Sequence, residues 1–230
     1  MNDEKNGCLY LISTPIGNLK DITFRALETL QQVDYLLCED TRHSLKLLNH
    51  YNIKKHLESY FVGNERHKTG QVIQDLLSGK QVGLISDGGT PCISDPGNYL
   101  VHQCHEHRIR VIPIPGVSGL ATALSLTGIA DKPSLFIGFL PRSPNKINRI
   151  LMKIKDFEGN IILYESPYRV IKLLKILHEK LGNVKLFLFK ELTKVFESIK
   201  LGHITDILDD IGEQELKGEY VIIISAESRS

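Results

Sequence analysis

Eight short apolar runs alternate along the chain with longer stretches of helical periodicity, and this alternation restricts the fold more than any other feature. The runs are rich in β-branched, leucine and aromatic residues, as is typical of buried strands. They cover residues 8–13, 34–39, 81–86, 109–114, 134–139, 160–165, 184–189 and 219–224. Strands that alternate with helices favour an α/β protein in which the strands pair largely in parallel.

Two of the intervening stretches have clear helical patterns. Residues 64–78 repeat apolar side chains every three or four positions, and Gly79 directly after them predicts a C-terminal cap. Residues 168–180 show the same periodicity. Both stretches predict helices that bury one face against a sheet.

A domain boundary is expected at IPIPGVSG, residues 112–119, where two prolines and two glycines interrupt the alternation. We therefore place an N-terminal α/β domain at residues 1–114 and a C-terminal α/β domain at residues 115–230. No internal repeat and no low-complexity tract is found in the sequence.

Composition restricts the protein class without identifying a function. The chain has 230 residues, of which 42% are hydrophobic and 24% charged, so it can bury a substantial core and is unlike disordered chains. No run approaches the roughly 20 apolar residues of a membrane-spanning helix, and the polar start MNDEKNG differs from a signal peptide. We expect a cytoplasmic protein whose four widely spaced cysteines stay reduced.

Charge is unevenly distributed along the chain. Its total is +1, but residues 142–200 contain 13 Lys or Arg against 6 Asp or Glu, and the last thirty residues are acidic. Such a basic middle segment could bind a polyanion such as nucleic acid. It is equally compatible with a lysine-rich surface that only contacts solvent.

Polar segments follow most of the predicted strands directly. In open α/β sheets, ligands bind beyond the carboxyl ends of the strands, so these segments are the first place to look for a site. They are STPIGN at 13–18, CEDTR at 38–42, SDGGTPCISDPG at 86–97, PGVSG at 115–119 and SPYR at 166–169.

The loop SDGGTP has adjacent glycines that let a ligand approach the backbone closely. It lacks the lysine and the spacing of a phosphate-binding loop, and Asp87 and Asp95 add negative charge. This chemistry disfavours a polyphosphate and suits a ligand with positive charge, such as an amino acid moiety or a sulfonium. The alternative is a tight turn with no ligand. A Rossmann dehydrogenase is disfavoured because the first strand leads into TPIGN instead of a glycine-spaced turn.

The other polar clusters carry weaker signals. In HQCHEH, His102 and His105 share a helix face while Cys104 and His107 point elsewhere, so no metal site is expected. Carboxylate pairs such as Glu39 with Asp40 or Glu191 with Glu197 could serve as acid and base, but exposed carboxylates are usually only solvated.

Nine segments in order resemble the ribosomal RNA small subunit methyltransferase I family of the tetrapyrrole methylase superfamily. The similarity covers nearly the whole chain. The segments are LYLISTPIGNLKDIT at 9–23, CEDTRHSLKLL at 38–48, NERHK at 64–68, SDGGTPCISDPG at 86–97, PGVSG at 115–119, FIGFLPR at 136–142, LYESPYR at 163–169, KELTKVFE at 190–197 and KGEYVII at 217–223.

This resemblance implies two α/β domains with S-adenosyl-L-methionine held between them, and a homodimer. It also implies 2′-O-methylation of a cytidine in the decoding region of 16S ribosomal RNA, free or in the small subunit. By position in the motifs, the implied cofactor contacts are Pro15, Asp87, Gly88, Gly89, Ile93, Ser118, Gly119, and Tyr164 or Glu165. The family more often has alanine in place of Gly88, and proline and a small residue in place of Val117 and Ser118.

The same motifs suggest catalytic and RNA-binding residues. A base must remove the hydroxyl proton, and the candidates are Asp40, Glu65, Glu191 and Lys194. Lys194 could act only if burial or a neighbouring positive charge lowers its pKa. Guanidinium and ammonium groups suit RNA phosphates, and the candidates for this contact are Arg42, Arg142, Lys146, Arg149 and Arg169. Lys146 and Arg149, one turn apart on an expected helix outside these motifs, are equally compatible with an exposed helix face.

Two other functions remain open. A methyltransferase of the same superfamily that acts on a tetrapyrrole would use a similar cofactor site, although the basic segment and the TPIGN and SDGGTP motifs argue against it. A noncatalytic RNA-binding module with the same fold would bind RNA but no cofactor, which the presence of Pro15, Asp87 and Gly89 disfavours.

Overall fold

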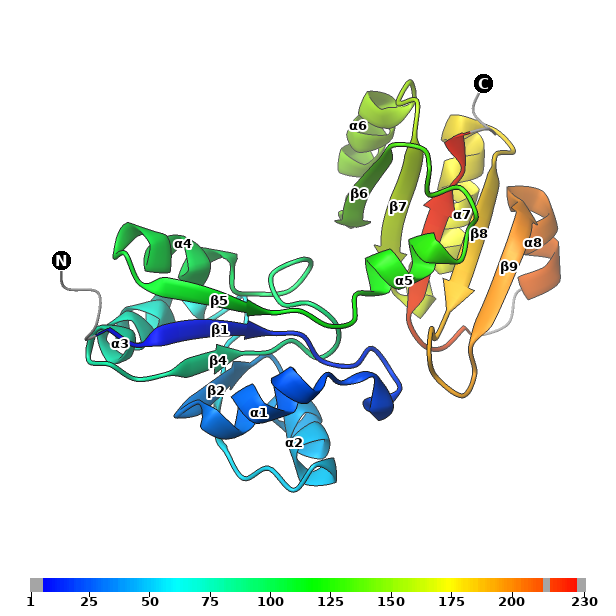
Figure 1. Ribbon diagram of the computed structural model, residues 1–230. Helices are drawn as coiled ribbons and strands as arrows, with labels where there is room; N and C mark the ends of the chain where they lie inside the picture. The colour runs from blue at the N-terminus through cyan, green and yellow to red at the C-terminus, as the bar shows by residue number, and fades with distance from the viewer. Residues whose placement is uncertain (1–5, 213–215, 227–230) are drawn as a thin grey trace. The chain divides into compact units, whose positions relative to one another are not determined.

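The computed structural model describes residues 6–212 and 216–226 and divides into two compact units, Met1–Ser118 and Gly119–Ser230 (Figure 1). The division falls between Ser118 and Gly119, a few residues beyond the sequence-based position after residue 114. Each unit is built from one five-stranded sheet with its helices. The predicted α/β fold class is therefore confirmed.

The first unit contains a wholly parallel sheet in the order β3-β2-β4-β1-β5. The strands of this sheet are β1 Cys8–Ile12, β2 Tyr35–Cys38, β3 His56–Ser59, β4 Val82–Leu84 and β5 Arg110–Ile114. Because all five run in the same direction, their carboxyl ends share one edge of the sheet. Strand β3 was not predicted from the sequence, because HLES is an edge strand with few apolar side chains.

Helices connect the strands of the first unit and bury apolar faces against the sheet. They are α1 Phe24–Gln32, α2 Thr41–His50, α3 Glu65–Leu77 and α4 Asn98–Glu106, with a short 3₁₀ helix at Leu19–Asp21. The predicted helix at 64–78 corresponds to α3, and Gly79 follows it with a positive φ of 101°, as a C-terminal cap requires.

The second unit has a mixed sheet in the order β6-β7-β10-β8-β9. Its strands are β6 Ser134–Phe139, β7 Asn160–Glu165, β8 Lys185–Lys190, β9 Ser198–His203 and β10 Tyr220–Ile224. Only β6 and β7 pair in parallel, so the expectation of largely parallel pairing is wrong for this unit. The reason is that β8 and β9 form a hairpin through residues 191–197 instead of a helical crossover, and β9 itself was missed because it is a half-exposed edge strand.

Three helices cover one face of the second sheet, and a fourth lies on the other face (Figure 1). Apolar residues of α6, α7 and α8 form a single buried cluster with alternate residues of β7, β8 and β10. On the opposite face, α5 contacts β10. The bounds are α5 Gly119–Ser125, α6 Pro144–Ile154, α7 Pro167–Leu181 and α8 Ile204–Ile211.

Within the described residues, no helix is long and apolar enough to span a membrane. In the same part of the chain, no three His, Cys, Asp or Glu side chains gather as metal ligands would. His102, Cys104 and His105 all lie on α4, where the Cys104 side chain is buried in the core. Burial raises the pKa of the Cys104 thiol to about 12, which fits a structural thiol.

Candidate functional site

The predicted site residues of the first unit gather where its parallel strands end. We call this region the first sheet edge; it consists of residues 13–18, 39–40, 86–97 and 115–118, which follow β1, β2, β4 and β5. The predicted residues Pro15, Asp40, Asp87–Gly89, Ile93 and Ser118 all lie here. Glu65 lies farther out, at the start of α3 beyond the edge strand β3.

Backbone hydrogen bonds join the first and third loops of this edge. The N–H of Thr14 donates to the Gly89 carbonyl at 2.9 Å, and the N–H of Gly89 donates back to the Thr14 carbonyl at 2.9 Å. Gly89 has a φ of +87°, a conformation that side-chain-bearing residues rarely adopt. The glycine is therefore required by the way the loop meets its neighbour, and the reading of SDGGTP as an isolated tight turn is incomplete.

Buried hydroxyl groups extend this connection to the other loops. The hydroxyl of Thr14 donates to the Ser86 carbonyl at 3.2 Å. Ser13 donates to the Thr90 hydroxyl at 3.3 Å, and Thr90 donates to the Val117 carbonyl at 3.2 Å. None of these four residues was predicted as part of the site, although a signal was present: each ends a predicted strand or follows one within a few positions. Together they fix the three loops after β1, β4 and β5 as one surface.

Gly88 lies on the exposed side of the same loop. A methyl group added here would lie 3.3 Å from the Pro15 carbonyl oxygen, which is tighter than ordinary van der Waals contact. The glycine found where the family more often has alanine thus relieves a close approach between two loops. Pro15 itself is buried, so its role at this edge is mainly to shape the loop, whereas the Ile93 side chain is 49% exposed.

Negative charge dominates the first sheet edge. A carboxylate oxygen of Asp87 accepts a hydrogen bond from the backbone N–H of Asp40 at 3.3 Å. Burial, and then the nearby Asp87 charge, raises the pKa of Glu39. In the part of the chain that the structure describes, no Lys, Arg or His lies within ion-pair distance of Asp87. The edge therefore offers a carboxylate to a positively charged ligand, as the sequence predicted.

The Asp40 carboxylate caps the following helix and pairs with Arg42. It accepts the backbone N–H of Arg42 at 2.8 Å and so caps α2, and the Arg42 guanidinium lies 3.3 Å away. The hydrogen bonds from Arg42 lower the pKa of Asp40, which makes this carboxylate a weaker base. The Arg42 side chain is 89% exposed.

A second group of predicted residues lies at one edge of the second sheet. We call this region the second sheet edge; it consists of residues 139–142, 164–169, 190–197 and 218–220, where β6, β7 and β8 end and β10 begins. The structure places Tyr164, Glu165, Glu191, Lys194, Arg142 and Arg169 here. Lys146 and Arg149 lie beyond it, on the exposed side of α6.

Tyr164 belongs to an aromatic cluster on the face that α5 partly covers. Its ring makes edge contacts with Phe136 and Phe139, at centroid distances of 5.0 and 5.7 Å. Gly119, the first residue of α5, lies so close that an added Cβ would be 3.2 Å from the Tyr164 hydroxyl oxygen. This face places a cluster of aromatic rings beside a helix start that carries no side chain.

Glu165 and Arg169 form a buried ion pair instead of two separate binding groups. The Glu165 side chain is fully buried, and one of its oxygens lies 3.3 Å from the Arg169 guanidinium. The other oxygen accepts the backbone N–H of Ser166 at 2.8 Å. Arg169 also donates to the carbonyls of Leu140 at 2.9 Å and Pro141 at 3.1 Å. Arg169 therefore ties the loop after β6 to the start of α7, and an RNA phosphate would have to compete with these acceptors.

Glu191 and Lys194 form a second charged network. The Lys194 ammonium group donates to Glu191 and to Glu219, both at 2.9 Å, and the N–H of Glu219 donates to Glu191 at 2.9 Å. Burial favours the neutral lysine, but these hydrogen bonds outweigh it and raise the pKa of Lys194. The lowered pKa that a basic Lys194 requires is thus not found. Burial similarly opposes the hydrogen bonds to Glu191, which nevertheless lower its pKa.

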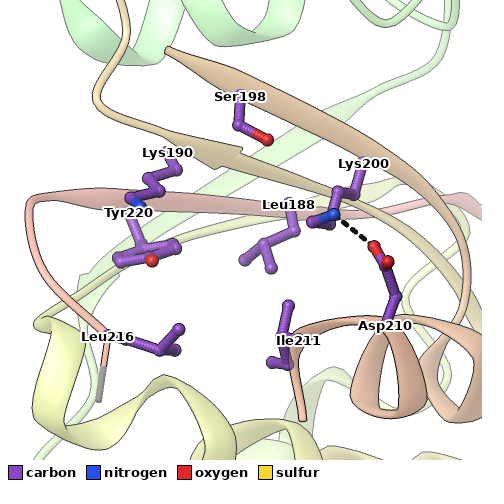
Figure 2. A pocket seen from close by; sticks show the side chains of 8 residues that line it. All are labelled: Leu188, Lys190, Ser198, Lys200, Asp210, Ile211, Leu216 and Tyr220. Atoms are coloured by element: carbon purple, nitrogen blue, oxygen red, sulfur yellow. Dashed lines mark hydrogen bonds and ion pairs between the residues drawn. The ribbon is translucent and has the colours of Figure 1, made fainter. Parts of the chain in front are cut away.

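A cavity of about 260 Å³ lies within the second unit, on the side of the sheet that α8 covers (Figure 2). None of the predicted site residues lines it. Two of its charged lining residues, Lys200 and Asp210, already form an ion pair with one another. It is also smaller than the roughly 300–1,000 Å³ of typical ligand pockets, so we assign it no ligand. Its lining residues are Leu188, Lys190, Ser198, Lys200, Asp210, Ile211, Leu216 and Tyr220.

Comparison with known proteins places this architecture in a family. The model of the Tetrapyrrole (Corrin/Porphyrin) Methylases matches residues 8–208. Two relatives named ribosomal RNA small subunit methyltransferase I, from Mycoplasmopsis pulmonis and Haemophilus influenzae, are 45% and 42% identical to this chain. The alignments cover 94% and 97% of this chain, and 96% and 80% of the relatives.

A solved structure has the same fold at much lower identity. The uroporphyrin-III C-methyl transferase of Thermus thermophilus, complexed with S-adenyl homocysteine, is 16% identical and superposes with a TM-score of 0.66. The superposition covers 96% of this chain and 99% of that one. The chain therefore belongs to the tetrapyrrole methylase family and, within it, to the ribosomal RNA small subunit methyltransferase I family.

Proposed function

We propose that this protein transfers the methyl group of S-adenosyl-L-methionine to the 2′ hydroxyl of a cytidine in the decoding region of 16S ribosomal RNA, in the cytoplasm. The observation that carries this proposal is the identity of more than 40% over nearly the whole chain to relatives named for methylation of small-subunit RNA. The cytidine and the 2′ oxygen come from the family resemblance and are the finer part of the proposal.

The residues at the two sheet edges fit this cofactor. At the first edge, the exposed Gly88 leaves its backbone uncovered by a side chain, and the Asp87 carboxylate suits an ammonium or sulfonium group. At the second edge, the Tyr164 cluster offers aromatic surface beside Gly119. S-adenosyl-L-methionine, when bound, supplies a methyl group on a positively charged sulfur. We propose Pro15, Asp87, Gly88, Gly89, Ile93, Ser118, Gly119 and Tyr164 as its contacts, and choose Tyr164 over Glu165 because the Glu165 side chain is fully buried against Arg169.

The chain must also orient the hydroxyl and accept its proton as the oxygen–methyl bond forms. Much of the rate in such a transfer can come from positioning. Asp40, Glu191 and Lys194 are held in ion pairs that favour their charged forms. Glu65 is half-buried, and its carboxylate has no hydrogen-bond or ion-pair partner among the described residues. We therefore propose Glu65 as the first of the four candidate bases to test.

Labelled methyl transfer tests the proposed function directly. Small ribosomal subunits from a strain that lacks the enzyme would be incubated with labelled cofactor, and alkali-resistant 2′-O-methyl sites would be mapped. We expect one methylated cytidine in the decoding region. If neither subunits nor free RNA accept the methyl group while cofactor binding is measurable, the acceptor is another molecule, such as a tetrapyrrole.

Glu65→Gln separates a base from a merely structural carboxylate. As a proton acceptor, Glu65 would contribute about 10²–10⁴-fold to the rate, so its loss should lower single-turnover methylation by that factor. Glu106→Gln, at an exposed position of α4, is the matched control. If all four candidates can be changed without loss of single-turnover rate, none of them is the base.

We also propose that the protein forms a homodimer through the second unit. Ile199 and Leu201 on the edge strand β9 are 45% and 52% exposed, and Phe196 just before the strand is 76% exposed. Exposed edge strands with apolar side chains pair readily with another chain. Light scattering should give twice the chain mass of 25.9 kDa, and Ile199→Lys with Leu201→Lys should give the monomer. A wild-type monomer at micromolar concentration would contradict this proposal.

A further inference from the structure

The helices that cover the second sheet differ sharply in charge. Helix α6 has three Lys or Arg and no Asp or Glu, and α7 has four Lys or Arg and one Glu. Helix α8 has three Asp and no Lys or Arg. All three bury apolar side chains in the same cluster, so packing does not require this separation. Ordinary protein surfaces intersperse both signs of charge, and the separation therefore points to a charged ligand at α6 and α7.

The basic side chains form two exposed rows. On α6 they recur at i, i+3 and i+7, and on α7 the exposed Tyr168 and two lysines recur at i, i+4 and i+7. Positions that are three, four or seven apart lie on one face of a helix, and seven residues span about 10 Å. The rows are Lys146, Arg149 and Lys153 on α6, and Tyr168, Lys172 and Lys175 on α7.

The two rows lie side by side on the same surface, which we call the α6–α7 face. Strands β6 and β7 run parallel, and each is followed by its helix, so α6 and α7 run in the same direction. The helices pack against one another, and packed helix axes are typically about 8–10 Å apart. Both begin at the second sheet edge, where Arg142 lies at the start of the α6 row and Tyr168 starts the α7 row.

The cations of the α6–α7 face are available to a ligand. In the described part of the chain, no carboxylate lies within ion-pair distance of the five Lys and Arg residues in the two rows. Several cations elsewhere are already paired: Lys68, Lys80 and Lys200 each lie within ion-pair distance of an Asp or Glu. Arg169, the remaining cation at the start of α7, is turned toward Glu165 and does not belong to the face.

Tyr168 gives the face an aromatic group. Its side chain is 83% exposed, although the ring would normally gain stability from burial. It follows Pro167 at the first turn of α7, so the backbone that carries it is restrained. Exposed aromatic rings beside basic side chains are the usual platform on which unpaired bases stack. An anionic membrane or an acidic protein would use the cations but would not need this ring.

We infer that the α6–α7 face binds a single-stranded segment of the substrate RNA, with phosphates on the two rows of cations and an unpaired base stacked on Tyr168. This inference rests on the proposed function, because it assigns the substrate RNA a second contact region outside the residues proposed to bind the cofactor. It also moves the expected RNA contact from Arg169 to Lys172, Lys175 and Tyr168.

Fluorescence anisotropy with a labelled single-stranded fragment of small-subunit RNA tests the inference. Lys172→Glu with Lys175→Glu should weaken binding at least tenfold and reduce the slope of log affinity against log salt by about 2. Lys54→Glu with Arg110→Glu makes the same change of charge at exposed positions of the first unit and should change neither quantity appreciably. Equal losses in both double variants would mean that only total charge matters and would overturn the inference.

Tyr168→Ala examines stacking separately from charge. Loss of one stacked base should weaken binding by about 5- to 100-fold with no change in the salt slope, and Tyr168→Phe should retain wild-type affinity. Unchanged affinity in Tyr168→Ala would refute the stacking contact. Tighter binding of the wild type to phosphatidylserine vesicles than to RNA, lost in the Lys172 and Lys175 variant, would identify a membrane face instead.

The same preparations distinguish this inference from the proposed function. If the wild type methylates small subunits but none of the face variants loses RNA affinity, the α6–α7 face is wrong and the function stands. If the face variants lose affinity but the wild type methylates neither subunits nor free RNA, the face stands and the proposed function fails.

Discussion

The two sheet edges that carry the candidate residues are held together by different interactions. At the first sheet edge, the loops after β1, β4 and β5 are joined by neutral hydrogen bonds, such as the Thr14–Gly89 pair and the bond from Thr90 to Val117. At the second sheet edge, the ion pair of Glu165 and Arg169 and the network around Lys194 perform this role. We therefore expect the first edge to depend on backbone conformation, and the second on charge.

The difference follows from sheet topology. Parallel strands bring the carboxyl ends of β1, β4 and β5 to one edge, so their loops lie close enough for direct backbone contact. In the mixed second sheet, the ends of β7 and β8 alternate with the start of β10. Longer side chains then span the distances between segments that run in opposite directions.

Arg169→Met should give the largest loss of stability. It leaves the Glu165 carboxylate buried without a positive partner, which typically costs about 3–5 kcal/mol in a buried pair. The partial exposure of Arg169 places the expected loss near the lower limit, at about 3 kcal/mol. Urea unfolding would measure it. The double variant with Glu165→Gln should recover part of the loss, and a double variant as unstable as Arg169→Met alone would show that the ion pair is not the cause.

Gly89→Val should have the next largest effect, on cofactor affinity. Valine at a φ of +87° is strained by about 1–3 kcal/mol, which would disturb the bridge to Thr14. We expect titration calorimetry to show cofactor binding weakened by about 5- to 150-fold. Gly70→Ala is the control, because nothing lies within 4 Å of the added methyl group. Wild-type affinity in Gly89→Val would mean that this loop does not hold the cofactor.

A smaller effect should appear in the pH dependence of stability. The pKa of Glu191 is lowered by folding, so its contribution is present above its unfolded pKa and lost as pH falls through the folded value. The pKa of Lys194 is raised, so its contribution is present below its unfolded pKa and lost as pH rises through the folded value. Glu191→Gln with Lys194→Met should flatten both limbs of a plot of melting temperature against pH. Unchanged limbs would assign them to other groups.

Gly88→Ala should have the smallest effect and should sharpen the comparison. The added methyl group meets the Pro15 carbonyl oxygen at 3.3 Å, a contact that a shift of a few tenths of an ångström relieves. Such a shift should leave cofactor affinity within about fivefold of the wild type, since mild overpacking costs on the order of 1 kcal/mol. A larger loss would mean that the two loops cannot separate by even a few tenths of an ångström.

The fold could be predicted from local patterns because its buried strands are nearly continuous apolar runs. All eight predicted strands are present, and α3 and α7 begin and end within a residue of the predicted bounds. The edge strands β3 and β9 were missed because half of their side chains face solvent. The antiparallel pairing of β8 with β9 and β10 was also not predicted, because the apolar pattern of a strand does not depend on the direction in which its neighbour runs.

The sequence predicted which residues belong to the candidate site, but it did not predict which of them contact one another. The motifs brought attention to Gly89, Glu165 and Lys194, and all three lie at the predicted strand ends. The contacts of these residues depend on the tertiary structure. Gly89 pairs with Thr14, 75 positions away, and Lys194 pairs with Glu219, 25 positions away. The burial of Glu165 against Arg169 depends on how the start of α7 is oriented. Periodicity cannot report such contacts.

The sequence by itself determined the fold class, the strand-end location of the candidate residues and the family, because these depend on local hydrophobic patterns and on the order of motifs. Only the tertiary structure decided which charged groups are available. Arg169 and Lys194 are as basic in the sequence as Lys172 and Lys175, yet the first two are paired with carboxylates and the last two face solvent. The physical reason is that the free energy of a charge depends on its neighbours in space and on its exposure to water.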